Sequence, residues 1–320
     1  MSDGLLNRCH FGDVREVLRS LIDAGVRVQT IVTSPPYWGL RDYGHPGQLG
    51  LEQTPEQYVA AMVEVFREVR RVLRDDGTLW LNLGDSYWSS TATQGRNEDK
   101  AHGAIGGTAK LIAGGSSTYK RTALGLKPKD LIGIPWRVAF ALQADGWYLR
   151  QDLIWHKPNP MPESVTDRCT KAHEYIFMLT KSQRYFYDHE AVKEPSVMRP
   201  QNRGTRRADH PKGDAGRSAH VRPEGGTSYI SRNRRSVWTV ATRPYKGAHF
   251  ATFPTDLIEP CILAGAPAGG IVLDPFFGSG TTGQVAQALG RQYIGIELNE
   301  AYKPLQDERL RQPALKLEPA

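Results

Sequence analysis

Residues 270–282 read GIVLDPFFGSGTT, and this stretch decides the fold. The apolar run Gly270–Leu273 has the composition of a buried strand, and a loop with two glycines separates it from a helix predicted over Thr282–Leu289. A second apolar strand, Tyr293–Glu297, follows this helix. A strand, a glycine-rich turn, a helix and another strand make one βαβ unit, which predicts a parallel sheet of the α/β class.

The loop of this unit has the composition of a site for a nucleoside-containing cofactor. Its glycines allow a sharp turn and a close approach of the backbone to a ligand, and the helix N-terminus beyond them offers free N–H groups. An acid at the end of the next strand can accept both hydroxyls of a ribose. No lysine follows the second glycine, so the loop is not a phosphate-binding P-loop. The predicted cofactor contacts are Asp274, Phe276, Gly278, Gly280, Thr281, Thr282 and Glu297.

The same alternation of strands and helices runs through most of the remaining chain. Further strands are predicted at Gln29–Thr33, Thr78–Leu83, Tyr148–Trp155 and Glu174–Leu179, and further helices at Pro55–Leu73 and Leu131–Leu142. Ligands of such sheets bind beyond the carboxyl ends of the strands. Two loops occupy such positions, the glycine-rich loop and the sequence TSPPYW at 33–38.

The TSPPYW loop has the features of a rigid site for an amino group. Both prolines fix φ and donate no hydrogen bond, but their carbonyls remain acceptors. The Ser34 hydroxyl is a further acceptor, and Tyr37 and Trp38 offer flat faces for stacking. The sequence therefore predicts catalytic roles for Ser34, Pro35, Pro36 and Tyr37, and a substrate contact for Trp38. A proline-kinked loop that only covers the core is the alternative interpretation.

Composition limits the class of protein. The chain has 320 residues, of which 39% are hydrophobic and 23% charged, as expected for a globular protein with a real core. No apolar run approaches the ~18 residues of a membrane helix, and no signal peptide is visible. The cysteines Cys9, Cys169 and Cys261 lie far apart, which excludes a disulfide scaffold or a CxxC metal site. We therefore expect a cytoplasmic protein without a metal.

The net charge of +7 is concentrated in one segment. Residues 193–246 contain thirteen basic and four acidic residues, so this segment carries +9 and the rest of the chain −2. The segment is rich in Gly, Pro and Ser, so it is either a solvated linker or a surface that neutralises phosphates. Its candidate DNA contacts are Arg203, Arg206, Arg207, Arg232, Arg234 and Arg235. A second glycine-rich stretch, 89–126, is interpreted as a mobile flap, with disorder as the alternative.

Together, TSPPYW and the downstream DPFFGSGTT resemble the S-adenosylmethionine-dependent DNA amino-methyltransferases of the permuted β group, in which the catalytic motif precedes the cofactor motif. The resemblance spans residues 5–180 and 247–302. It implies that Asp13, in NRCHFGD, contacts the cofactor adenine. It also implies that HFATFP at 249–254 borders the methionine end of the cofactor, and that WHKPNPMP at 155–162 packs near the target base. The residues that these two motifs add are His249, Phe253, Pro254, Lys157 and Asn159.

This resemblance implies a Rossmann-like fold, with a mostly parallel twisted sheet flanked by helices. Residues 1–184 would form the catalytic part, 185–246 a basic target-recognition region and 247–320 the cofactor-binding part. S-adenosyl-L-methionine would be the cofactor and double-stranded DNA the substrate, in a prokaryotic cell or phage. A cognate restriction endonuclease and a homodimer are further expectations.

The implied reaction moves a methyl group to the amino nitrogen of a base that has left the DNA stack. Tyr37 would stack on this base, while the Ser34 hydroxyl and the Pro35 carbonyl accept hydrogen bonds from its amino group. In the family, a serine at the first position of this motif goes with N4 of cytosine and an aspartate with N6 of adenine. Ser34 therefore favours cytosine, and N6-adenine is the alternative. A catalytically dead DNA-binding protein and an RNA or small-molecule methyltransferase are weaker alternatives, and Cys261 is expected to be a buried residue rather than a nucleophile.

Overall fold

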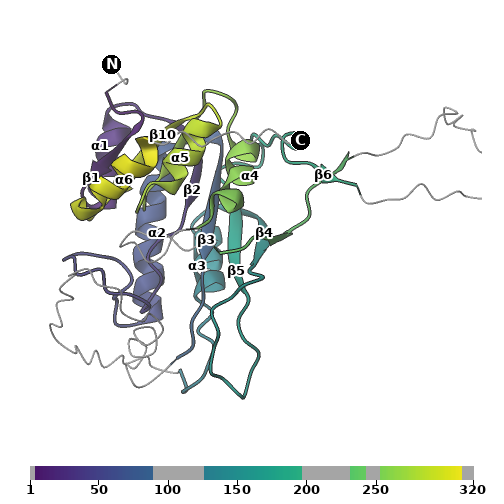
Figure 1. Cartoon of the computed structure of the whole chain (residues 1–320). Helices are drawn as coiled ribbons and strands as arrows, with labels where there is room; N and C mark the ends of the chain where they lie inside the picture. The colour runs from purple at the N-terminus through teal and green to yellow at the C-terminus, as the bar shows by residue number, and fades with distance from the viewer. Residues whose placement is uncertain (1–3, 89–125, 197–230, 243–252, 312–320) are drawn as a thin grey trace, which may run out of the picture.

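The computed structural model describes residues 4–88, 126–196, 231–242 and 253–311. Its centre is an eight-stranded sheet in the order β1-β10-β9-β2-β3-β5-β4-β8 (Figure 1). These strands are β1 (Arg8–Phe11), β2 (Val28–Thr33), β3 (Leu73–Leu83), β4 (Tyr148–His156), β5 (His173–Thr180), β8 (Val237–Thr239), β9 (Ile271–Asp274) and β10 (Gln292–Glu297). Only β5 pairs in antiparallel fashion, with β3 and β4, and the other pairings are parallel. The prediction of a mostly parallel α/β sheet is confirmed.

Helices cover both faces of this sheet. One face packs against α1 (Val14–Asp23), α2 (Pro55–Val72) and α3 (Ile134–Ala144), whose apolar side chains form one core with those of the sheet. The other face packs against α4 (Thr255–Gly265) and α5 (Thr281–Ala288), which form a second core. The 3₁₀ turn η1 (Glu300–Tyr302) leads into α6 (Lys303–Arg311), which contacts α5. None of the helices among the described residues is long and apolar enough to cross a membrane.

The predicted boundaries of two elements change for identifiable reasons. Helix α2 begins at Pro55 because Thr54 and Gln57 form a reciprocal capping box, and it ends at Val72 because the chain turns directly into β3. Strand β3 therefore starts before the predicted Thr78. Helix α3 begins at Ile134 instead of the predicted Leu131, because the carboxylate of Asp85 accepts the N–H groups of Gly133 and Ile134.

The topology brings the two predicted loops together. From β9 the chain passes through α5 to β10 on one side, and from β2 it passes through α2 to β3 on the other side. The strands β9 and β2 are hydrogen-bonded neighbours, with Ile31 paired to Leu273. The strand order thus reverses between them, and the crevice at such a reversal is where open α/β sheets bind ligands. The TSPPYW loop follows β2 and the glycine-rich loop follows β9, so both lie at this point.

The described ends of the basic segment belong to the main sheet and its core. Strand β8 extends the main sheet beside β4, and Val192 and Trp238 are buried in the second core. Between them, β6 (Glu194–Pro195) and β7 (Ser231–Arg232) pair as a short ribbon that projects from the sheet (Figure 1). The predicted boundaries of the target-recognition region, at 185 and 246, remain a prediction. The described residues at both ends of this region belong to the sheet and its core.

Candidate active site

The glycine-rich loop is held in place by a buried carboxylate. Asp274 Oδ1 accepts hydrogen bonds from Thr33 Oγ1 (2.7 Å) and the Phe276 backbone N–H (3.0 Å), and its Oδ2 accepts one from Thr282 Oγ1 (2.6 Å). Asp274 is 1% exposed, and this burial raises its pKa to about 6. The Asp274 carboxylate and the Thr282 hydroxyl therefore shape the loop and tie it to β2. Their predicted direct contacts with a cofactor are not supported by this placement.

Gly278 and Gly280 have the conformation for which glycine was predicted. Their φ angles are 52° and 87°, in the left-handed region that side chains disfavour. Gly280 is also the N-cap residue that precedes α5, so the first N–H groups of this helix face the end of the loop. Thr281, the first residue of α5, is 4% exposed, and its hydroxyl accepts a hydrogen bond from Arg309.

Glu297 lies at the carboxyl end of β10, as predicted. Its Oε2 accepts the Gly278 N–H (2.8 Å) and its Oε1 accepts the Asn299 N–H (2.9 Å). A carboxylate has about four acceptor positions, so two remain for the hydroxyls of a ribose. Burial raises the pKa of Glu297 above its usual value. Asp13 lies near this strand end, since Gly12 N–H bonds to the Glu297 carbonyl, and its carboxylate caps α1 and pairs with Arg15.

The hydroxyl group of Ser279, also in the glycine-rich loop, is buried without a hydrogen-bond partner among the described residues. Ser279 is 1% exposed. A buried hydroxyl without a partner costs free energy, and a bound ligand would remove this cost. The loop therefore fits a polar ligand that lies against Ser279, Gly278 and Glu297. Phe276, also predicted to contact the cofactor, is partly buried beside the first core.

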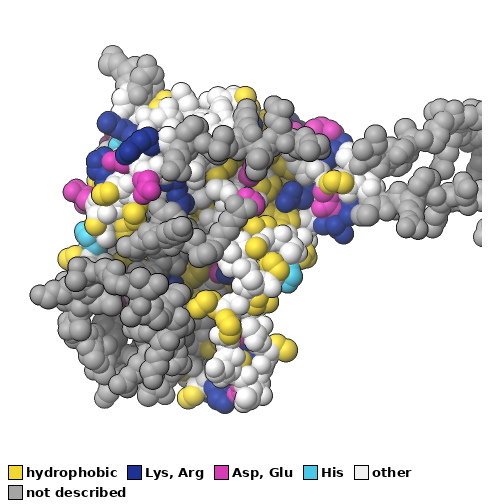
Figure 2. All heavy atoms as spheres, in the orientation of Figure 1, with side chains coloured by type: hydrophobic (Ala, Val, Ile, Leu, Met, Phe, Trp, Pro, Cys, Tyr) yellow, Lys and Arg dark blue, Asp and Glu magenta, His cyan; other side chains and the backbone are white. Residues whose placement is uncertain are grey.

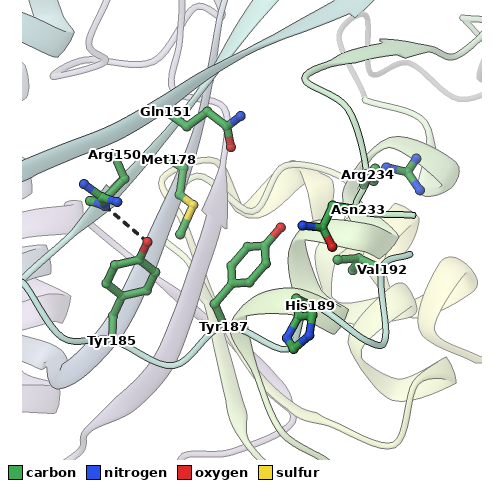
Figure 3. Close-up of a pocket in the computed structure, with 9 residues that line it drawn as sticks. All are labelled: Arg150, Gln151, Met178, Tyr185, Tyr187, His189, Val192, Asn233 and Arg234. Atoms are coloured by element: carbon green, nitrogen blue, oxygen red, sulfur yellow. Dashed lines mark hydrogen bonds between the residues drawn. The ribbon is translucent and has the colours of Figure 1, made fainter. Parts of the chain in front are cut away.

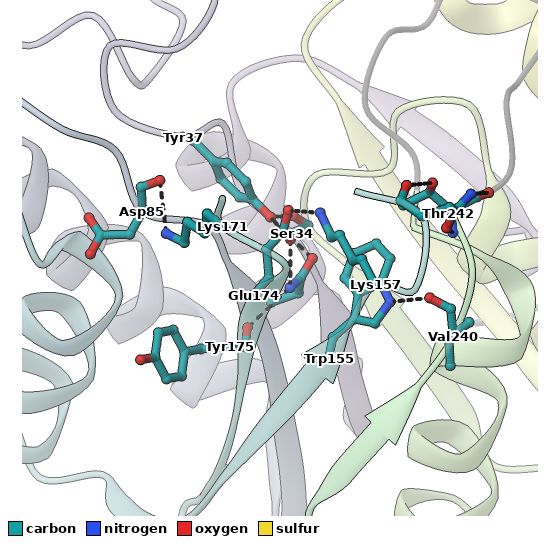
Figure 4. A network of polar contacts seen from close by, with 12 residues as sticks. Ser34, Tyr37, Asp85, Trp155, Lys157, Lys171, Glu174, Tyr175, Val240 and Thr242 are labelled. Carbon is teal, nitrogen blue, oxygen red and sulfur yellow. Dashed lines mark hydrogen bonds and ion pairs between the residues drawn. The ribbon is translucent and has the colours of Figure 1, made fainter. Parts of the chain in front are cut away.

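The second loop presents Ser34 and Tyr37 as parts of one hydrogen-bonded chain (Figure 4). Ser34 Oγ donates to Tyr37 Oη at 3.3 Å, and Tyr37 Oη lies 2.8 Å from Glu174 Oε2 and 3.1 Å from Asn82 Oδ1. A carboxylate can only accept, so the chain runs from Ser34 through Tyr37 to Glu174. The lone pairs of Ser34 are then left to accept a hydrogen bond from a substrate.

The position of Tyr37 is fixed by packing as well as by hydrogen bonds. A Cβ atom on Gly84 would lie 2.5 Å from Tyr37 Cε2, so only glycine at that position leaves room for the ring. Burial, and next the charge of Glu174, raise the pKa of Tyr37 well above its usual value. Tyr37 therefore stays a neutral hydroxyl.

The two prolines differ in their availability. The Pro36 carbonyl accepts a hydrogen bond from the Tyr58 hydroxyl (2.9 Å), so it anchors the loop to α2. The Pro35 carbonyl accepts no hydrogen bond from any described residue, so its predicted contact with a substrate stays a prediction.

Glu174 lies on β5 and connects the TSPPYW loop with Lys157, which directly follows β4. Its Oε1 pairs with the ammonium of Lys157, which also lies 4.2 Å from the centre of the Trp155 ring. Its Oε2 accepts a hydrogen bond from Asn82 Nδ2 (3.2 Å). Glu174 and Lys157 are 16% and 19% exposed, so this ion pair is largely shielded from solvent. The structure thus places Lys157 in the network beneath Tyr37.

The prediction that Trp38 contacts the substrate is wrong. Its side chain is 1% exposed, stacks on Trp88 with ring centres 6.2 Å apart, and donates from Nε1 to the Glu52 carbonyl. Two adjacent aromatic residues leave the loop in different directions, and Trp38 turns into the core. Spacing alone does not decide which of the two faces the substrate.

Other predicted DNA contacts have partners within the protein. The Asn159 amide exchanges hydrogen bonds with the backbone of Thr242. Arg232 and Arg235 both pair with Glu194 at the base of the ribbon, where Figure 2 shows basic and acidic side chains side by side. The Arg234 guanidinium lies 4.7 Å from the Trp238 ring. Arg203, Arg206, Arg207 and His249, and all but residue 126 of the stretch 89–126, lie outside the described residues. Of the motif around His249, Phe253 packs beside the second core and Pro254 precedes α4.

A pocket of about 260 Å³ lies between β4, the segment after β5 and the described residues next to β7 (Figure 3). Arg150 of β4 donates a hydrogen bond to Tyr185 at one end of it, and Asn233 and Arg234 line the other end (Figure 3). It contains none of the predicted catalytic residues.

Two further predictions concern Cys261 and the binding of a metal ion. Cys261 is 1% exposed within α4, and burial raises its pKa, so it is a buried residue as predicted. No group of three or more His, Cys, Asp or Glu side chains among the described residues could hold a metal ion.

Sequence reasoning missed Ser279, Asn82 and Glu174. A signal for Glu174 was present, because a carboxylate at the start of an apolar strand must be paired in the folded protein. Asn82, polar within TLWLNL, carried a similar signal. Which partner each would find depends on the antiparallel pairing of β5 with β3, in which Asn82 faces Ile176.

The order of the sheet, the loop at its reversal and the rigid TSPPYW loop define a Rossmann-like methyltransferase fold. Comparison with solved structures supports this class. The structure entitled PvuII DNA methyltransferase (cytosine-N4-specific) aligns with a TM-score of 0.61 and 18% identity, covering 96% of this chain and 87% of that one. The complex of M1.HpyAVI with SAM aligns with a TM-score of 0.54 and 16% identity, covering 95% and 99%.

Sequence comparison gives the family. The model of the N6 and N4 methyltransferases, described as "DNA methylase", matches residues 28–308. Type II methyltransferase M.SmaI of Serratia marcescens is 50% identical over 299 residues, which cover 93% of this chain and 89% of that protein. Type II methyltransferase M.Cfr9I of Citrobacter freundii is 52% identical over 299 residues, covering 93% and 86%. The chain belongs to this family of DNA methylases, whose members depend on S-adenosylmethionine, and the resemblance seen in its motifs is confirmed.

Proposed function

We propose that the protein transfers a methyl group from S-adenosyl-L-methionine to N4 of a cytosine that has been flipped out of double-stranded DNA. The direction of the hydrogen-bonded chain is the observation that carries this proposal. The hydroxyl proton of Ser34 points to Tyr37, so Ser34 Oγ and the free Pro35 carbonyl form a pair of acceptors. An exocyclic amino group has two N–H donors and suits such a pair.

Positioning and electrostatics would supply most of the catalysis. When these two oxygens accept hydrogen bonds from both N–H groups, the nitrogen lone pair turns away from conjugation with the base ring. It is then available to attack the methyl group. The ring of Tyr37, anchored through its hydroxyl, would support the face of the base. When bound, S-adenosyl-L-methionine supplies a methyl group on a positively charged sulfur.

The cofactor would be held by the glycine-rich loop. Glu297 would accept the ribose hydroxyls through its two remaining acceptor positions, and Ser279 Oγ would gain the partner that it lacks. Asp13, close to the same strand end, remains the predicted contact for the adenine. Phe253 and Pro254 remain predicted neighbours of the methionine end.

Replacing Glu297 with alanine is expected to weaken S-adenosyl-L-methionine binding by ~1–3 kcal/mol, through the lost ribose hydrogen bonds and the freed Gly278 N–H. Isothermal titration calorimetry measures this change directly. The matched control is Glu300→Ala, an acid in the η1 turn that follows β10. Equal affinities of the wild type and Glu297→Ala would remove Glu297 from the cofactor site.

DNA would approach the edge of the sheet where both loops end, and the segment 185–246 would contact its phosphates and read its sequence. A DNA substrate places the protein in the cytoplasm of a prokaryotic cell or of a phage-infected cell. A restriction endonuclease partner and a homodimer remain predictions from the resemblance.

Mass spectrometry of nucleosides tests the proposed base. Unmethylated genomic DNA, amplified in vitro, is incubated with the protein and S-adenosyl-L-methionine and then digested to nucleosides. We expect N4-methylcytosine and no N6-methyladenine. N6-methyladenine alone would establish the alternative base. DNA binding without either product would favour a catalytically dead fold.

A further inference from the structure

We propose that Glu174 is the final acceptor of the proton that the target amino group loses, and that Ser34 and Tyr37 relay this proton to it. This inference rests on the proposed function, in which Ser34 faces the amino nitrogen. Methyl transfer forms an N–C bond and breaks the S–C bond of the donor. The nitrogen must then release one proton to become a neutral methylamino group.

The hydrogen bonds of the site form a continuous route for this proton (Figure 4). Ser34 Oγ takes the N–H proton and passes its own hydroxyl proton over 3.3 Å to Tyr37 Oη. Tyr37 passes its hydroxyl proton over 2.8 Å to Glu174 Oε2. One N–H bond is broken and one carboxylic O–H bond is formed, and both hydroxyls end with one proton each.

The surroundings of Glu174 suit an acceptor. Lys157 and Asn82 both donate hydrogen bonds to its carboxylate, and neither donor group can take a proton from it. Lys171 and His173 are further titratable neighbours, and burial lowers the pKa of both. Arrival of a proton converts the Glu174 carboxylate to a neutral acid beside Lys157. The positive charge that methyl transfer creates on the substrate nitrogen is thereby removed from the substrate, and the ammonium of Lys157 carries it at this end of the route.

Tyr37 suits a relay because it does not store the proton. Burial and the nearby Glu174 charge keep its pKa well above the usual value, so it remains a hydroxyl before and after transfer. Its ring is held against Gly84, which keeps Oη within reach of both Ser34 and Glu174.

A different role for Glu174 would be to position Tyr37 without accepting a proton. Replacement by glutamine separates the two roles. Glutamine has nearly the same shape, and its amide oxygen can still accept the Tyr37 hydroxyl proton as a hydrogen bond, but an amide cannot take up that proton. Tyr37→Phe keeps the ring and breaks the relay at its middle.

The test is the single-turnover rate of methyl transfer to unmethylated, in vitro amplified genomic DNA, measured against pH. The wild-type rate is expected to fall on the acid side, because a carboxyl group that already carries a proton cannot accept the one from the substrate. Glu174→Gln and Tyr37→Phe are expected to lower the plateau rate about 10²- to 10⁴-fold and to remove the acid-side fall. Calorimetric affinity for S-adenosyl-L-methionine should be unchanged, which shows that the cofactor site is intact.

The matched control is Glu68→Gln. Glu68 is 15% exposed and pairs with Arg19 and Arg71 on the helical face away from the site, so its replacement should leave rate and pH profile unchanged. A Glu174→Gln variant with the wild-type rate and an intact acid-side fall would overturn the proton route and leave the proposed function standing. A wild-type protein that methylates no DNA would overturn the proposed function itself.

Discussion

Ser34→Ala is expected to lower the rate of methyl transfer by about 10²- to 10³-fold, the cost of losing one preorganised polar group at a reacting centre. The alanine methyl group cannot accept a hydrogen bond from the amino group, so the nitrogen lone pair is no longer directed toward the methyl donor. The Tyr37 hydroxyl also loses its donor at 3.3 Å, while its bonds to Asn82 and Glu174 remain. The loop therefore keeps its shape.

Single-turnover transfer of a labelled methyl group measures this loss, and calorimetry shows whether the cofactor still binds. We expect affinity for S-adenosyl-L-methionine to be unchanged, because Ser34 belongs to the loop after β2, whereas the proposed contacts of Ser279 and Glu297 with the cofactor lie after β9 and at the end of β10. Ser20→Ala is the matched control, since Ser20 is exposed on α1 and its hydroxyl donates to the Glu16 carbonyl. A Ser34→Ala variant with normal turnover would refute the assigned role.

The elements that the sequence predicts well are those with local signals. The periodic apolar face of α2 and its capping box lie within one stretch of chain, and Tyr58, Met62 and Phe66 are fully buried as expected. The meeting of the two loops also follows from sequence, because neighbouring parallel strands end at one edge of the sheet. The hydrogen bond from Thr33 to Asp274, across 241 positions, confirms that meeting.

The residues that escaped prediction depend on contacts between distant strands. Glu174 reaches Tyr37 because β5 runs antiparallel to β3 and therefore starts at the edge of the sheet where β3 ends. No feature of TSPPYW indicates that its tyrosine hydroxyl needs a carboxylate 137 positions away. The burial of Trp38 has the same origin, since its direction is set by Trp88 and Glu52. Composition and spacing identify the kind of site, whereas the register of the strands chooses the individual partners.

Asp274→Ala is expected to destabilise the protein by about 2–4 kcal/mol. The change leaves the hydroxyls of Thr33 and Thr282 and the Phe276 N–H without their acceptor in a buried place, and each unsatisfied group costs about 1–3 kcal/mol. Removal of the buried carboxylate, with its desolvation cost, offsets part of this sum. Urea unfolding at pH 7 measures the difference. Cofactor affinity should fall as well, because the tie between the loop and β2 is lost.

Asp274→Asn is the variant that separates shape from charge. Its amide fills the same space and can bond to both threonine hydroxyls, so we expect a loss below about 1.5 kcal/mol at pH 7. The pKa of Asp274 is raised to about 6 from an ordinary value near 3.8, so the folded protein binds this proton more tightly than the unfolded chain. Wild-type stability from this group is then present at low pH and is lost as pH rises from about 4 to 6.

The pH dependence gives the decisive comparison. As the pH is lowered from 7 to 5, the wild type should gain stability relative to Asp274→Asn, because the folded wild type takes up a proton that the variant cannot bind. A constant difference in unfolding free energy between the two proteins across this range would show that Asp274 is not held as a desolvated carboxylate. The loop would then owe its position to the backbone of β9 and α5 rather than to the buried acid that joins it to β2.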